Sequence, residues 1–125
     1  MVLDAALRGK ELTRIFVHEV FHFAWLRLGN ARRLSFEDLL HGEAKAHARG
    51  ELGWSAASRK QGLGKQDRRN RTRRWREYVC ESFCDTAAWH LSGVVEHEEF
   101  TLSRRWRNRR AEWFERLWEE GAVRV

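Results

Sequence analysis

Proline is absent from this chain of 125 residues, and runs of β-branched residues are scarce. Because proline breaks helices and β-branched residues favour strands, this composition predicts a mainly α-helical fold with at most a small β element. The length suits a single domain over residues 1–125. A hydrophobic content of 42% is enough to build a core.

Cysteines and long apolar runs are also scarce. The chain has only Cys80 and Cys84, which would make a poor disulfide four residues apart on one helix, so we expect a reducing, cytoplasmic compartment. Residues 1–12 lack the apolar segment of a signal peptide. No stretch resembles a transmembrane span, and we expect no membrane partner.

Acidic residues are outnumbered, with 18 Asp and Glu against 24 Lys and Arg and a formal charge of +6. An excess of arginine indicates an acidic partner or nucleic acid, but it also serves solubility. Six arginines lie between Arg68 and Arg76. The sequence has no helix-turn-helix or zinc-finger spacing, so we expect nucleic-acid binding to be weak and non-specific.

Apolar periodicity and capping residues predict four helices, over residues 13–29, 35–49, 67–91 and 101–119. Their expected N-caps are Thr13, Ser35, Asp67 and either Thr101 or Ser103. We expect Gly29 and Asn30 to end the first helix.

Two segments are expected to be less regular. Residues 1–12 form either a strand fragment or the lead-in to the first helix. Residues 50–66 hold four of the nine glycines and are expected to form a loop, with a short extended piece near Glu51–Ser55. This loop is either a substrate-binding rim or a plain surface connection.

The first helix contains the sequence His18-Glu19-Val20-Phe21-His22, an H-E-x-x-H pattern. Residues four apart share a face of a helix, so His18 and His22 can bind one zinc ion, with Glu19 as the general base of a hydrolase. The surrounding residues are almost all apolar, which predicts a buried helix. The alternative is a chance match in which both histidines are hydrogen-bonded in a core.

A catalytic zinc needs a third protein ligand. The metzincin spacing H-E-x-x-H-x-x-G-x-x-H is excluded, because Trp25 and Leu28 replace the required glycine and histidine. Glu81 and Asp85 share a face of the helix expected over 67–91, so Glu81 can bind zinc while Asp85 accepts the ring N–H of a ligating histidine. The other candidates for the third ligand are His41, His47, His90, His97 and Cys84.

The combination of H-E-x-x-H on one helix and E-x-x-x-D on a later one resembles the gluzincins, the thermolysin-like zinc peptidases. In length the chain is most similar to the minigluzincins, so we expect a zincin-like helical core. The resemblance implies His18, His22 and Glu81 as zinc ligands, Glu19 as base and Asp85 as the carboxylate behind the ligands. Gluzincins usually carry a β-sheet before the motif helix, whereas only 12 residues precede it here. Either residues 50–57 supply a strand or the start codon is placed too late.

We therefore expect a zinc-dependent metallopeptidase that acts on a peptide or protein substrate. Tyr78, the only tyrosine, lies one turn before Glu81 and is a candidate donor to the oxyanion, although a core position is the alternative. Two other functions remain open: a basic helical nucleic-acid-binding protein, and a zinc-binding interaction domain without activity.

Overall fold

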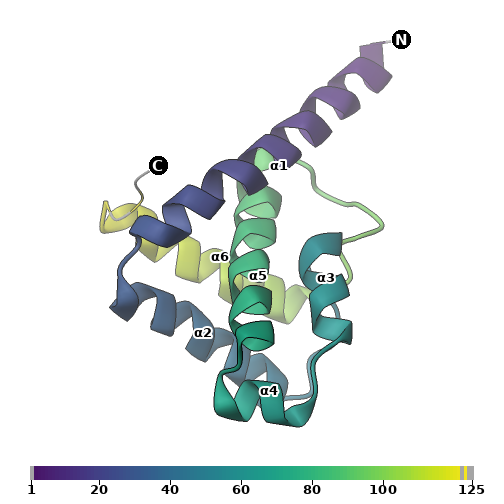
Figure 1. Ribbon diagram of the computed structural model, residues 1–125. Coiled ribbons are helices and arrows are strands. Elements are labelled where there is room, and N and C mark those ends of the chain that lie inside the picture. Colours follow the sequence, from purple (N-terminus) through teal and green to yellow (C-terminus); the bar gives the residue numbers. More distant parts are fainter. Residues whose placement is uncertain (1, 122, 124–125) are drawn as a thin grey trace.

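The computed structural model describes residues 2–121 and 123, and the regular secondary structure within them is entirely α-helix. Figure 1 shows the arrangement, in which the elements are α1 (Val2–Arg27), α2 (Asn30–Lys45), α3 (Trp54–Gln61), α4 (Lys65–Asn70), α5 (Arg73–Ser92) and α6 (Arg104–Glu119). The described residues contain no strand, so the prediction of a mainly α fold is confirmed. No helix among them is long and apolar enough to cross a membrane.

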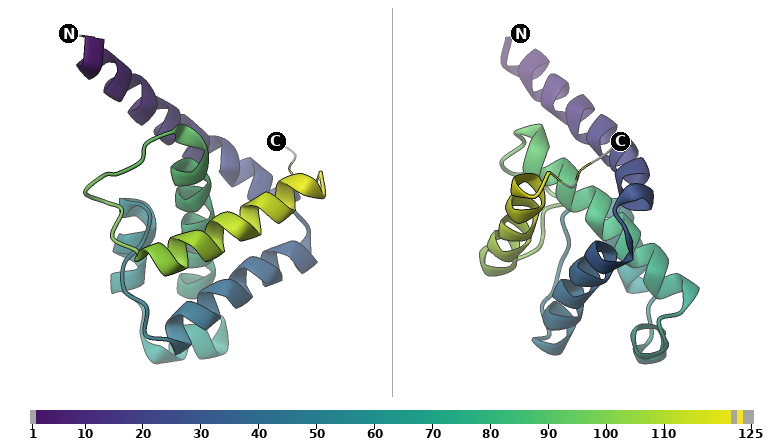
Figure 2. Two further views of the ribbon diagram at one scale, coloured as in Figure 1. Left: turned by 180° about the vertical axis from the view of Figure 1, so that it is seen from behind. Right: turned by 90° about the vertical axis from the view of Figure 1, so that its left-hand side faces the viewer.

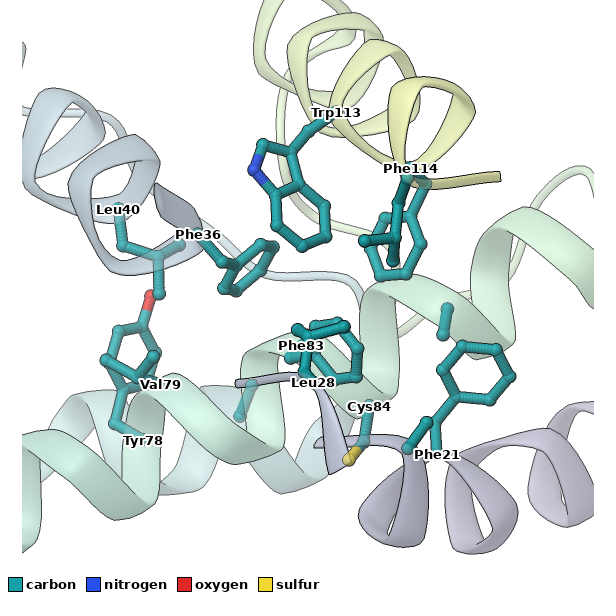
Figure 3. Close-up of a cluster of buried hydrophobic side chains, with 14 of the residues drawn as sticks. Phe21, Leu28, Phe36, Leu40, Tyr78, Val79, Phe83, Cys84, Trp113 and Phe114 are labelled. Carbon is teal, nitrogen blue, oxygen red and sulfur yellow. The ribbon is translucent and has the colours of Figure 1, made fainter. Parts of the chain in front are cut away.

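The helix α5 is the centre of the fold, because it contacts each of the other five helices. The side chain of Phe83, on α5, is fully buried. The ring of Phe83 lies 4.8–5.6 Å from one ring on each of three other helices, namely Trp25, Phe36 and Phe114. Figure 3 shows Phe83 with Phe36 and Phe114 in the buried cluster between α1, α2, α5 and α6. The seen-from-behind view in Figure 2 shows α6 crossing α5, with α2 beside it.

A buried polar network lies beside the aromatic cluster. The guanidinium of Arg110 is fully buried and donates two hydrogen bonds to Glu43, at 2.8 and 2.7 Å, and two to Glu51, at 2.9 and 3.0 Å. Burial raises the pKa of Glu51, but the charge and hydrogen bonds of Arg110, together with the hydrogen bond from Tyr78, outweigh burial, and the pKa is lowered. Breaking such a pair typically costs about 3–5 kcal/mol. The network therefore fixes the segment that leads from Gly50 into α3.

The N-terminal residues belong to the motif helix. Because α1 begins at Val2, the prediction of a strand fragment over residues 1–12 is wrong for the residues that the structure describes, and the alternative of a lead-in is correct. Thr13 is not an N-cap, since it lies within α1 and its hydroxyl bonds to the Gly9 carbonyl at 2.9 Å. Gly29, with φ of 90°, does mark the turn after α1.

The segment predicted as one helix over residues 67–91 is two helices. Arg71, with φ of 47°, separates α4 from α5, and the Thr72 side chain caps α5 by accepting from the Trp75 N–H at 3.4 Å. Asp67 stabilises the turn between the two helices, because its carboxylate accepts hydrogen bonds from the Thr72 hydroxyl at 2.7 Å and from the Gly64 N–H at 2.8 Å. The segment therefore contains a second helix start, because Thr72 is an effective N-cap for α5.

Three other boundaries differ from the prediction. The helix expected over 35–49 runs from Asn30 to Lys45, so Ser35 is not its cap. The loop expected over 50–66 contains α3, and its extended piece pairs with no strand among the described residues. The last helix begins at Arg104 with Ser103 at the N-cap position, three residues later than expected.

Candidate metal centre

The ligand atoms of three residues converge where α1 crosses α5. The Nε2 atoms of His18 and His22 lie 3.3 Å apart. The Glu81 carboxylate faces both, with Oε2 at 3.0 Å from Nε2 of His22 and Oε1 at 3.7 Å from Nε2 of His18. Two imidazoles and one carboxylate are the donor set of a catalytic zinc site with three protein ligands. The chemistry of the residues present therefore fits a zinc ion.

Asp85 lies one turn beyond Glu81 on α5 and contacts the far side of the His18 ring. The Nδ1 atom of His18 is 2.7 Å from Oδ1 of Asp85. A carboxylate at this distance accepts the Nδ1–H of the ring and fixes its orientation, so that Nε2 is the nitrogen that faces His22 and Glu81. The contact with Asp85 thus fixes the orientation of the His18 ring.

The start of α3 holds both carboxylates in place. The Ser55 hydroxyl donates to Oε1 of Glu81 at 2.6 Å, and the Ala56 N–H donates to Oδ2 of Asp85 at 2.8 Å. The backbone of Gly53 lies so close to Asp85 that a Cβ atom there would overlap the carboxylate. Residues 53–56 thus form a supporting wall behind the Glu81 and Asp85 carboxylates.

The electrostatics of the group couple His18 to the two carboxylates. Burial lowers the pKa of His18, but its contacts with Asp85 and Glu81 outweigh burial and raise the pKa to about 10. Burial raises the pKa of Glu81, yet the contacts with His18 and Ser55 lower it to about 2. The two carboxylates therefore favour the protonated, positively charged ring of His18 in the metal-free protein.

An open cleft of about 530 Å³ gives access to this group of residues. Glu19 is exposed and lines the cleft together with His18, His22 and Glu81. Two exposed apolar side chains also line it, Ile15 from α1 and Trp54 from the start of α3. The Glu19 carboxylate, the three converging side chains and the apolar surface thus share one solvent-accessible space.

Both cysteines lie at the edge of the same group. The Sγ atom of Cys80 is 3.8 Å from Nδ1 of His22. Cys84 is fully buried one turn further along α5. Together with Glu81, these residues form a set in which His22, Cys80, Glu81 and Cys84 offer ligand atoms within 4.8 Å of one another. The structure therefore brings Cys84, one of the alternatives to Glu81, close to the site.

The four remaining histidines lie outside the cleft. The ring of His41 stacks on Trp75 at 5.0 Å, and His90 packs 6.1 Å from Phe114. The backbone of His47 is left-handed, with φ of 57°. His97 contacts Glu99 and lies 3.7 Å from Glu11. None of these histidines lines the cleft among the residues that the structure describes.

Tyr78 requires a correction, because it does not line the cleft in the described part of the chain. It is buried, and its hydroxyl donates to Glu51 within the Arg110 network. Although it lies only three residues before Glu81, its hydroxyl is directed to Glu51 and not into the cleft. Tyr78 therefore belongs to the core, which was the alternative to an oxyanion donor.

Sequence reasoning missed the supporting residues Gly53, Ser55 and Cys80. Only the glycine-rich composition of residues 50–66 indicated that this segment was unusual. The contact of Gly53 with Asp85 joins residues 32 positions apart, which no local pattern encodes.

Comparison with known proteins assigns no function to these residues, since no family model, curated protein or solved structure significantly matches this chain.

Proposed function

We propose that the protein is a zinc-dependent metallopeptidase that hydrolyses peptide bonds. The observation that supports this most strongly is the convergence of His18, His22 and Glu81 on one point, where Nε2 of His22 lies 3.3 Å from Nε2 of His18 and 3.0 Å from the Glu81 carboxylate. These three residues would hold the zinc ion. Zinc supplies Lewis acidity to such a site, which activates water near neutral pH and polarises a carbonyl group.

The protein's own residues supply the proton transfers and the positioning. Glu19 lies in the cleft beside the ligands, where its carboxylate accepts a proton from the attacking water and returns it to the leaving amine. Asp85 orients the His18 ring, and Ser55 orients the Glu81 carboxylate. These contacts hold the ligands in position before a substrate arrives, which lowers the reorganisation needed for catalysis.

The cleft favours a polypeptide with apolar side chains near the cleaved bond. Ile15 lies one turn before Glu19 on α1, and Trp54 lies on α3; both line the cleft and are exposed by 53% and 68%. Burial of such surface against a substrate side chain contributes roughly 25 cal/mol per Å².

The two free thiols agree with a reducing environment, and the proposal includes a cytoplasmic location.

Replacement of Glu19 by glutamine tests the catalytic proposal. Glu19→Gln keeps the size and polarity of the side chain but removes the base, so we expect unchanged zinc content and a loss of cleavage by about 10²–10⁴-fold. Cleavage of an unfolded protein or a peptide library would be followed by mass spectrometry.

The matched control is Glu77→Gln, which neutralises an exposed glutamate on α5 outside the cleft and should cleave like the wild type. Zinc-loaded wild-type protein that cleaves no member of the library would contradict the peptidase proposal. It would favour a zinc-binding interaction domain instead.

A further inference from the structure

The cysteines Cys80 and Cys84 flank Glu81 on α5 and face α1. Both are free thiols. Figure 3 shows Cys84 between α5 and α1, near Phe21. His22, Cys80, Glu81 and Cys84 each offer one ligand atom, and these atoms all lie within 4.8 Å of one another. The proposed hydrolytic site uses neither thiol, so their presence in this cluster calls for another explanation.

The spacing of these atoms suits a four-coordinate metal. A tetrahedral ion with metal–sulfur and metal–nitrogen bonds of ordinary length keeps its ligand atoms roughly 3.3–3.8 Å apart. The distance between Sγ of Cys80 and Nδ1 of His22 is already 3.8 Å. The four ligand atoms lie within 4.8 Å of one another, so they need to approach by only about 1 Å to reach this spacing.

We propose that His22, Cys80, Glu81 and Cys84 form a second cation position that is selective for thiophilic metals such as Cd²⁺ or Cu⁺. Thiolate ligands favour soft cations, whereas the set of His18, His22 and Glu81 contains only nitrogen and oxygen. The two thiols release their protons when the metal binds. His18 takes no part in this position and keeps its contact with Asp85.

The two cation positions exclude one another because they share ligands. Nε2 of His22 faces His18 and Glu81, and Nδ1 of the same ring faces Cys80. A neutral imidazole has a lone pair on only one of its nitrogens, so His22 serves one position at a time. When a thiophilic ion is bound by the thiols, His22 and Glu81 are therefore no longer available to the position that they share with His18. If the proposed peptidase activity holds, this ion inhibits it through the thiols.

Titration of Cd²⁺ into reduced, metal-free protein tests the second position directly. Sulfur-to-cadmium charge transfer in the ultraviolet reports thiolate binding without any measurement of activity. We expect one equivalent of Cd²⁺ to saturate this band in the wild type. Cys80→Ala and Cys84→Ala should each weaken binding at least about tenfold, and His22→Ala should weaken it as well, whereas His18→Ala should bind Cd²⁺ through the thiols as the wild type does.

Cys80→Ala decides the question if Cys84→Ala does not fold, because Cys80 is only partly buried. A Cd²⁺ affinity that is unchanged in Cys80→Ala, or a charge-transfer band that disappears in His18→Ala, would overturn the proposal. Peptide cleavage provides a second measurement. Cd²⁺ should inhibit the zinc-loaded wild type at a lower concentration than it needs to inhibit the zinc-loaded Cys80→Ala variant. Absence of all hydrolysis would contradict the peptidase proposal alone, since the charge-transfer band is independent of it.

Discussion

His18 is the residue on which the candidate site depends most, because it has a partner on each side of its ring. Its Nδ1 contacts Asp85 at 2.7 Å, and its Nε2 faces His22 and Glu81. A histidine between two carboxylates is strongly basic when no metal is bound. Its protonation should therefore be visible in the stability of the metal-free protein.

The sign of this effect follows from the direction of each pKa shift. The pKa of His18 rises from 6.5 to about 10 on folding, so its contribution to stability is fully present below pH 6.5 and is lost as the pH rises through 10. The pKa of Glu81 falls from 4.5 to about 2, so its contribution is present above pH 4.5 and is lost as the pH falls through 2. We expect this pair to stabilise the metal-free protein most between pH 4.5 and 6.5.

Urea unfolding of metal-free protein at a series of pH values would measure this. The free energy of unfolding should decrease from pH 6.5 to 10 in the wild type, and it should decrease less in His18→Gln, which has no titrating ring. Equal pH dependence in the two proteins would show that His18 is not held protonated by its neighbours.

Among the elements, the start of α3 makes the largest contribution to the site that sequence patterns failed to predict. The site residues on α1 and α5, in contrast, were predicted. The H-E-x-x-H and E-x-x-x-D spacings predicted which residues of α1 and α5 could meet, because helical periodicity places them on one face. The helix boundaries were less predictable. Gly29 was predicted to end the first helix, but the cap at Thr72 lies inside a segment whose apolar pattern predicted one continuous helix. The wall at Gly53–Ala56 depends on tertiary contact, and no spacing rule reaches it.

Gly53→Ala tests the role of this wall. The added methyl group would overlap the Asp85 carboxylate, so the carboxylate must move away from the His18 ring. We expect zinc affinity to fall about 10–100-fold, as it should in Asp85→Ala, because both changes remove the partner that orients His18. Competition with a fluorescent zinc chelator measures this affinity.

Gly42→Ala is the matched control, because a Cβ at this position of α2 meets nothing within 4 Å. It should bind zinc like the wild type and gain up to about 1 kcal/mol of stability from helix propensity. If Gly53→Ala binds zinc as tightly as Gly42→Ala, the wall does not position Asp85.

At the scale of the whole molecule, the charge distribution allows a test of the nucleic-acid alternative. The protein carries a formal charge of +6, and the arginine run lies over α4 and the start of α5. Two of its members are already paired, Arg71 with Glu37 at 2.9 Å and Arg73 with Glu77 at 3.0 Å. We expect weak binding to any labelled duplex, with an affinity that falls steeply as salt increases. Sequence-selective binding at physiological salt would favour the nucleic-acid function over the peptidase.

The most direct test of the account is the zinc content of the purified protein and of its ligand variants. Metal analysis after purification without chelators should find about one zinc per chain in the wild type, because the three proposed ligands converge on one position. Glu81→Ala and the double variant His18→Ala/His22→Ala should lose this zinc. His47→Asn, which removes an exposed histidine outside the cleft and tolerates the left-handed backbone there, should keep it. Wild-type protein without zinc, or a Glu81→Ala variant that binds zinc as tightly as the wild type, would contradict the assignment of this metal centre.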